Sequence, residues 1–410
     1  MEVMYEVCAG IDVHKKNVVV CLLRAKAGSK CEREVRTFGT TTRSLLELLD
    51  WLVSAGCTHV AMESTGVYWK PVFNLLEGAM EVWLVNPQHI KALPGRKTDV
   101  KDCEWIADLM QHGLIKRSFI PPREIRELRD LVRTRTTLIR DRARQVNRIQ
   151  KVLEDANIKL ASVASDVLGV SGRAMIQAII NGQTDTETLA NLARGRMRSK
   201  KGELKEALWG RVTDHHRFLL RTHLGLVDTL ETHVAELSQR IEACMAPFAE
   251  ARDRLDAITG VGPEVATVVI SEIGTDMRYW PNHRHAASWA ALCPGHHESA
   301  GKRKSGRTRK GNKWLREALV QAAWAASHSR DTYMSAHFHR IRSHRGPKKA
   351  AVAVAHSIFV RCYHMLATGT EYHELGGDYL DQRRRNALQQ RLITRLERLG
   401  LKVTVQPAAA

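Results

Sequence analysis

The acidic pair Asp99 and Asp102 has the residue types and the spacing for chemistry. The two carboxylates stand three residues apart where a proline- and glycine-bearing loop gives way to a helical pattern. That pattern comes from apolar residues at helix spacing: Val100, Ile106, Leu109 and Met110. Side chains three apart share one face of a helix, so the pair should project together from its first turn. The helix dipole also favours acids there, so a plain helix cap is the alternative.

Two further acids, Asp12 and Glu63, fall at the ends of predicted strands. Alternating and apolar runs predict strands at 5–11, 17–23, 34–38, 59–62 and 82–85, with helices at 42–55, around 72–76 and from Asp99. Ligand sites of α/β sheets form at the carboxyl ends of the strands, so all four carboxylates are expected to meet there.

Four converging carboxylates would repel one another unless a cation bound them. Hard oxygen ligands suit Mg²⁺ or Mn²⁺, and a pair of such ions stabilises the attacking and leaving oxygens of a phosphodiester. This order of elements with these acids looks like an RNase H-like fold of the RuvC type. Ordinary strand-end and cap acids remain the alternative.

The net charge of the chain indicates which kind of molecule it binds. The 410 residues suffice for two or three domains, and 63 Lys and Arg against 44 Asp and Glu give +19 and a pI near 9.8. Such an excess points to a polyanion, by default nucleic acid. We expect no membrane partner, since neither a basic amphipathic anchor nor an apolar run near 18 residues stands out. Eight cysteines without a Cys-x-x-Cys pair fit a reducing, cytoplasmic location.

Two long helices are predicted in the middle of the chain. From Ile125 to Ala156 the pattern is helical, and nine basic residues face three acids between Arg126 and Lys151. A solvated charged face is one interpretation; a helix along phosphates is the other, with Arg135, Arg142 and Arg148 as contacts. A heptad from Leu220 to Phe248 predicts a second helix, paired with the first or with another subunit's copy. Residues 157–205 receive no clear assignment.

The C-terminal part carries two candidate nucleic-acid contacts. Residues 258–266 resemble a helix-hairpin-helix turn in which Gly260 and Gly262 allow close approach to a phosphate, a plain tight turn being the alternative. Residues 302–316 hold eight basic residues and no acid, which predicts a flexible cationic loop. Its candidate contacts are Lys302, Arg303, Lys304, Arg307, Arg309, Lys310 and Lys313. The adjacent His296 and His297 lack companion ligands and are not assigned a metal.

The predicted organisation is α/β followed by all-α. Residues 1–120 form a mixed sheet with helices and carry the acids, and 121–250 form a helical coiled-coil linker. Residues 251–370 form a helical domain, and 371–410 a basic, partly disordered tail.

Several motifs in order resemble the IS110-family transposases. They are Gly10–Lys15, Glu63–Trp69, Asn86-Pro87, Thr98–Asp102, Ile258–Gly262, Pro294–Ser299 and Lys310–Asn312 with Leu315-Arg316. The resemblance implies a RuvC-like domain in which Asp12, Glu63, Asp99 and Asp102 hold divalent metal. It also implies a C-terminal transposase domain with Ser299 as nucleophile.

Family membership would bring partners as well. The resemblance implies a recombinase that joins element-end and target DNA through a covalent phosphoserine, guided by a structured non-coding bridge RNA. It implies dimers that assemble into a tetramer, and a cytoplasmic, nucleoid-associated location when bound to DNA. Family members commonly place glycine directly after the serine, whereas Ala300 follows Ser299 here, so Ser305 is a second candidate. The rival functions are a junction nuclease that uses water and a non-catalytic nucleic-acid-binding protein.

Overall fold

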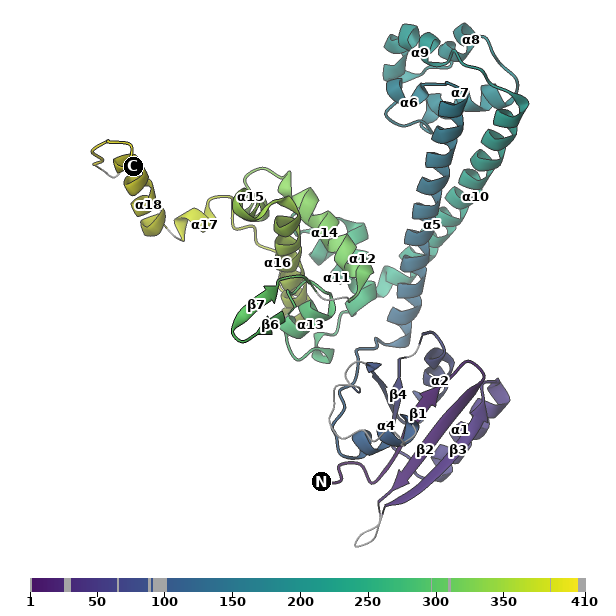
Figure 1. Cartoon of the computed structure of the whole chain (residues 1–410), viewed down its shortest axis with the longest axis vertical. Helices are drawn as coiled ribbons and strands as arrows, with labels where there is room; N and C mark the ends of the chain where they lie inside the picture. Colours follow the sequence, from purple (N-terminus) through teal and green to yellow (C-terminus); the bar gives the residue numbers. More distant parts are fainter. Residues whose placement is uncertain are drawn as a thin grey trace. The chain divides into compact units, whose positions relative to one another are not determined.

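The computed structural model comprises two compact units, residues 1–120 and 121–410, called the sheet unit and the helical unit below (Figure 1). The structure describes residues 2–25, 31–64, 66–87, 90, 102–295, 297–308, 311–383 and 385–404. Asp99, Arg309 and Lys310 therefore lie outside the described residues, as does His296.

The sheet unit contains a five-stranded mixed sheet in the order β3-β2-β1-β4-β5. β1 pairs antiparallel with β2 and parallel with β4, and β4 pairs parallel with β5. This order and mixture of directions confirm the predicted RNase H-like fold. The strands are β1 (Val7–Val13), β2 (Asn17–Arg24), β3 (Glu32–Gly39), β4 (His59–Glu63) and β5 (Glu81–Val85).

Helices cover both faces of this sheet because successive strand residues point to opposite sides. On one face, Ile11 and Met62 pack with the apolar residues of α1 (Thr42–Ser54) and α2 (Trp69–Leu76). On the other face, Cys8 and Ala61 pack with α4 (Asp102–Gln111). We call this second side the α4 face.

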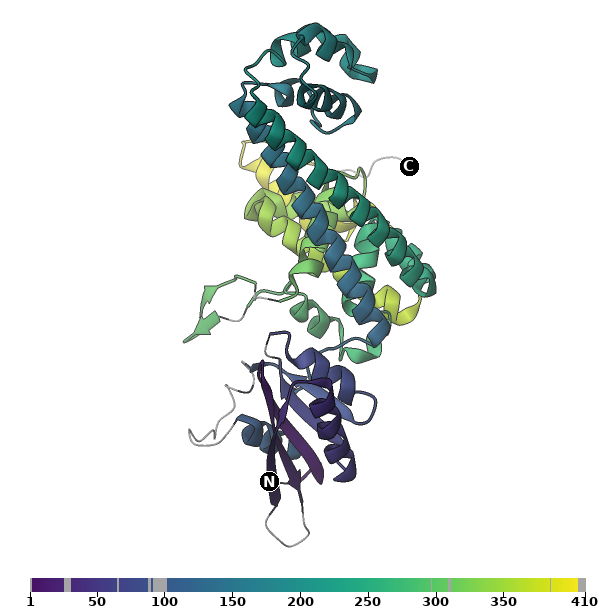
Figure 2. The same cartoon turned by 90° about the vertical axis from the view of Figure 1, so that its right-hand side faces the viewer.

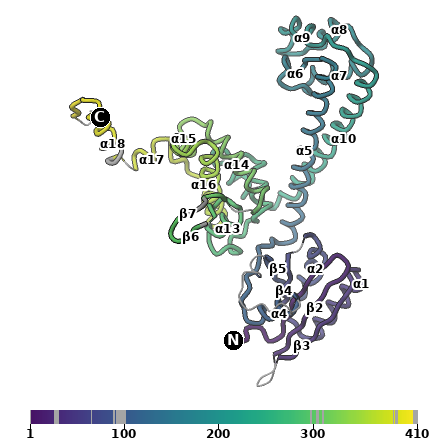
Figure 3. The backbone as a smooth tube through the Cα atoms, viewed as in Figure 1, coloured from purple at the N-terminus to yellow at the C-terminus, as the bar shows by residue number. Residues whose placement is uncertain are grey.

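The helical unit is built on two long helices, α5 (Arg123–Asp155) and α10 (Asp214–Met245). They lie side by side within one chain (Figures 2 and 3), so the intrachain alternative left open by the heptad is the one observed. Between them the chain forms a helical cap, whose apolar core also includes residues of α5 and α10. The cap consists of α6 (Leu160–Val163), α7 (Val170–Ile180), α8 (Thr186–Asn191), η1 (Gly195–Lys200) and α9 (Lys201–Ala207).

The rest of the helical unit packs around α16 (Pro347–Thr368), whose inward side is fully buried at Ile358 and Phe359. By length and composition α16 could cross a membrane, but it packs here as a core helix. It contacts α11 (Ala249–Asp256), η3 (Met277–Tyr279), α13 (His283–Trp289), α14 (Lys313–Ser327) and α15 (Tyr333–Arg345). Two further elements join the same unit: η2 (Ala246–Phe248) contacts α10 and α11, and α12 (Pro263–Ile273) contacts α5, α11 and α14. The tail forms α17 (Tyr379–Gln382) and α18 (Arg385–Glu397).

Candidate active site

Strand register places Asp12 and Glu63 at the same edge and on the same face of the sheet. In the parallel β1–β4 pair, Ile11 lies opposite Met62, and the two acids are the next residue of each strand. Asp12 lies opposite Val19 on the neighbouring strand β2, and Glu63 lies opposite Val85 on the neighbouring strand β5. Both valines pack on the α4 face, so both carboxylates belong to that face.

Asp102 reaches the same place because it is the first residue of α4. The helix lies very close to β1 at Gly10, where an added Cβ would stand 2.2 Å from the Cys103 carbonyl oxygen and 2.3 Å from the Ala107 nitrogen. Only glycine allows this approach. Gly10 and Asp12 share a face, so the contact that seats α4 also sets Asp102 near Asp12.

The electrostatics of Asp12 agree with this placement. Burial raises the pKa of its carboxyl group, His14 lowers it, and the charge of Asp102 raises it further. The His14 Nε2 lies 3.1 Å from Asp12 Oδ2, and the Asp12 side chain is 23% exposed. The ionised carboxylate is therefore held where burial and a neighbouring acid oppose its charge.

Arg33 ties α4 to the sheet from the other side. Its guanidinium lies 2.6 Å from Glu104 Oε2 and 3.1 Å from Asp108 Oδ1. Both acids are on α4 and Arg33 is on β3, so these ion pairs help fix the tilt of the helix that carries Asp102.

The donor set fits a divalent cation in its chemistry. Asp12, Glu63 and Asp102 are all hard oxygen donors on one face, and the repulsion felt by Asp12 is of the kind that a bound cation relieves. Within the described residues, no three acidic, histidine or cysteine side chains are already close enough to hold an ion together. Asp99 would belong to this set but lies outside the described residues.

Ser299 stands at the tip of a β-hairpin, which corrects the prediction of a flexible loop. β6 (His297–Ser299) and β7 (Lys302–Ser305) pair antiparallel, with Ser299 opposite Lys302. The two turn residues, Ala300 and Gly301, have φ of 50° and 70°. Positive φ at both central positions matches the twist of the strands, which is why a two-residue turn closes here.

This hairpin separates the two candidate serines. Ser299 is exposed beside the turn, while Ser305 pairs with His297 at the far end of β7. The base is closed by a bridge between Pro294 and Thr308 and by the Gly295 N–H, which donates to the Arg307 carbonyl at 2.9 Å.

The predicted cationic contacts divide between this hairpin and its flanks. Lys302, Arg303 and Lys304 lie on β7. Lys302 is exposed, as is Arg307, two residues beyond the strand. Lys313 opens α14, where its ammonium lies 4.9 Å from the centre of the Trp314 ring. The strand that follows Ser299 in the hairpin is therefore rich in basic residues.

The three predicted arginine contacts on α5 differ in their surroundings. Arg142 forms an ion pair with Glu231 of α10, Nε to Oε1 at 2.8 Å, and Arg135 reaches Ser238 of α10 at 3.5 Å. These two guanidinium groups therefore link the paired helices. Arg148 is exposed and bonds only weakly to Gln145, at 3.4 Å.

The two glycines of the predicted helix-hairpin-helix turn have different settings. Gly260 has φ of 86°, and a Cβ there would stand 2.4 Å from the Ala322 carbonyl oxygen of α14. Its immediate role is close packing between helices. Gly262 is the N-cap of α12 and has open space beside it, as phosphate approach would require.

Sequence reasoning missed a buried acid, Glu272, whose carboxylate joins three elements of the helical unit. Its side chain is 1% exposed, and Arg133 of α5 grips it with two bonds of 2.7 Å. Arg129 lies 3.3 Å from the same carboxylate, and Asn312 donates to it at 2.5 Å. The available signal was an acid near the end of the mostly apolar run that follows Glu264 in α12.

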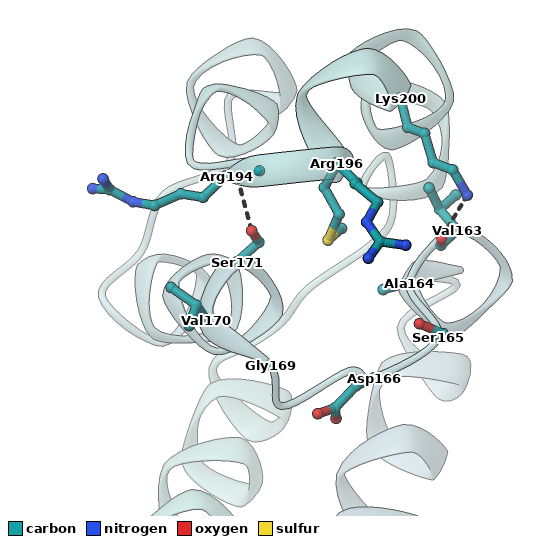
Figure 4. A pocket seen from close by; sticks show the side chains of 12 residues that line it. Val163, Ala164, Ser165, Asp166, Gly169, Val170, Ser171, Arg194, Arg196 and Lys200 are labelled. Atoms are coloured by element: carbon teal, nitrogen blue, oxygen red, sulfur yellow. Dashed lines mark hydrogen bonds between the residues drawn. The ribbon is translucent and has the colours of Figure 1, made fainter.

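The helical cap contains an open pocket of about 580 Å³ (Figure 4). Arg196 points into it and Arg194 points away. The Arg194 N–H donates to Ser171 Oγ at 2.8 Å and the Lys200 ammonium to the Val163 carbonyl at 3.3 Å. These bonds hold the rim together, and we assign the pocket no chemistry.

Comparison with known proteins identifies the class of the chain. A family model of DEDD transposases of the IS110 type, described as "Transposase", matches residues 9–158. A second, described as "Transposase IS116/IS110/IS902 family", matches residues 252–339. The first spans the carboxylates and the second spans the Ser299 hairpin, so the chain is a transposase. It belongs to the IS110 family.

Individual relatives carry related names. A family 20 transposase of Pseudomonas aeruginosa is 27% identical over 270 residues, covering 65% of this chain and 70% of the relative. A transposase of Sinorhizobium fredii is 25% identical over 341 residues, covering 81% and 78%. The Thermus thermophilus RuvC structure is 14% identical, with a TM-score of 0.21, over 27% of this chain and 99% of that protein.

Proposed function

We propose that this transposase cuts and rejoins DNA through a covalent phosphoserine, with Ser299 as nucleophile and Asp12, Glu63, Asp99 and Asp102 as the metal-binding set. The observation that carries the proposal is the placement of Asp12, Glu63 and Asp102 on one face at one edge of the sheet. A bound Mg²⁺ or Mn²⁺ would stabilise negative charge on the scissile phosphate and on the attacking and leaving oxygens.

The chain's own residues would supply the covalent step. The Ser299 Oγ attacks phosphorus and loses its proton to solvent, and one bridging P–O bond breaks to release a strand hydroxyl that gains a proton. The new phosphodiester keeps the energy of the broken bond, so a second strand hydroxyl can displace the serine without ATP. Lys302, opposite Ser299, would hold the phosphate by charge.

The partners follow from charge and family. The net charge of +19 favours a polyanionic partner, and we propose element-end and target DNA together with a structured bridge RNA. Gly262, Lys302, Arg303, Lys304, Arg307, Arg309, Lys310, Lys313 and Arg148 would be contacts, and Arg135, Arg142 and Gly260 would act through packing. We further propose dimers that assemble into a tetramer, in a cytoplasmic setting.

A trapping assay tests this function. Protein, Mg²⁺, flanking RNA and labelled element-end DNA are run on a denaturing gel beside Asp12→Ala, Ser299→Ala and Ser305→Ala. A protein–DNA band lost in Asp12→Ala and Ser299→Ala but kept in Ser305→Ala supports the proposal. Free cleavage products with no covalent band in any lane would establish the junction nuclease, in which water replaces the serine.

A further inference from the structure

The buried Glu272 carboxylate lies between the long helix α5 and Asn312, which follows the Ser299 hairpin in the chain. On the α5 side, Arg133 binds both oxygens at 2.7 Å, and Arg129 adds bonds to the main-chain carbonyls of Ser271 and Glu272 at 3.1 and 2.6 Å. Burial lowers the pKa of Arg129 to about 10, yet the group remains charged at neutral pH.

On the hairpin side, the link is Asn312. Its Nδ2 donates to Glu272 Oε2 at 2.5 Å, while its Oδ1 accepts from the Trp314 and Leu315 amides at 3.1 Å and so caps α14. Its own N–H donates to the Trp289 carbonyl at 3.3 Å. Asn312 follows Thr308, which closes the hairpin base, by four residues.

Stability alone is a weak reason for such a group. The desolvation free energy of a buried ion pair nearly cancels its Coulomb energy. Apolar residues of equal volume often stabilise a fold to the same extent. The cluster instead fixes the orientation of the groups that it joins. A two-bond arginine grip fixes the carboxylate plane, and that plane fixes where the Asn312 amide can lie.

We infer that Glu272 and Asn312 are positioning residues, which hold the Ser299 hairpin in a set orientation on α5. The inference rests on the proposed role of Ser299 as nucleophile. Transfer to phosphorus needs the Oγ in line with the breaking bond, and a displacement of about 1 Å costs on the order of 10²-fold in rate. Asn312 therefore contributes to the covalent step by orienting the hairpin.

The sharpest variant is Asn312→Ser. Serine caps helices about as well as asparagine, but its shorter side chain cannot reach Glu272. Asn282→Ser is the matched control, because Asn282 caps α13 by accepting from the Arg284 and His285 amides at 2.9 and 3.2 Å. The two substitutions are identical, and only one removes the link.

The measurements are the single-turnover rate of adduct formation, DNA affinity, and hydrogen exchange of the 297–308 amides. Asn312→Ser should slow adduct formation about 10- to 100-fold relative to Asn282→Ser, with unchanged affinity and faster exchange in the hairpin. In a cycle with Glu272→Gln, the double variant should be no slower than Glu272→Gln alone.

Equal rates and equal exchange in Asn312→Ser and Asn282→Ser would overturn the inference, as would a parallel loss of DNA affinity. If the wild-type protein formed no adduct, the proposed nucleophile would be wrong. The exchange comparison would then still decide whether the cluster positions the hairpin.

Discussion

Gly10→Ala should separate the carboxylates without touching any of them. The added Cβ would stand 2.2 Å from the Cys103 carbonyl oxygen, where ordinary contact begins at 3.4 Å, so α4 must retreat by about 1 Å in a close-packed interior. Overpacking of this kind costs about 1–3 kcal/mol. Because Asp102 opens α4 and Asp12 is fixed on β1, the gap between their carboxylates widens by a similar distance.

The cleavage rate should therefore fall by more than the loss of folding stability alone would cause. We expect cleavage by Gly10→Ala to fall on the order of 10²-fold, measured under single turnover with Mg²⁺ well below the melting temperature. Gly78→Ala is the control in the same unit, since an added Cβ there meets nothing within 4 Å; it should keep both rate and stability. Full activity in Gly10→Ala would refute the reasoning that α4 packing sets the site.

Three other perturbations test separate parts of the account. Asp12→Asn should have a higher melting temperature than the wild type at pH 7 without divalent cation. The pKa of Asp12 is raised in the folded protein, so its ionised form lowers stability above that pKa, and the difference should vanish below pH 4. A lower melting temperature of Asp12→Asn at pH 7 would contradict this expectation. Ala300→Gly should stabilise the hairpin by about 0.5–1 kcal/mol because φ is positive there, with slower amide exchange in β6 and β7; faster exchange would mean that the turn is not strained. Arg148→Ala should reduce by about 1 the slope of log binding constant against log salt concentration for nucleic acid. Arg142→Ala should leave this slope unchanged, because the Arg142 guanidinium is already paired with Glu231. Equal slopes for the two variants would contradict this difference.

The sheet and its acids were predictable because their signals are local. Short, mostly apolar runs over Val7–Val13 and His59–Glu63 mark each strand. Parallel strands end at the same edge, so the placement of Asp12 and Glu63 at that edge followed from order alone. The α4 pairing with Gly10 adds the third acid, Asp102. Asp99, the fourth predicted ligand, stays a prediction.

The remainder depends on conformation or on distant contacts. The hairpin was predicted as a loop because its turn uses Ala300, which gives no signal of positive φ. The helical cap is built from helices of 4 to 11 residues, too short for a clear period. The Glu272 cluster joins residues 139 positions apart, which no local pattern can reveal.

The most direct test of the account is to identify the atom that carries the DNA. Adduct trapped with Mg²⁺, RNA and element-end DNA would be digested with nuclease and trypsin and sequenced by tandem mass spectrometry. Ser299 falls in the tryptic peptide 285–302 and Ser305 in 305–307, so the two candidates are separated by mass. We expect a nucleotide remnant on Ser299. A remnant on Ser305, or no modified peptide beside cleaved DNA, would contradict the proposed nucleophile.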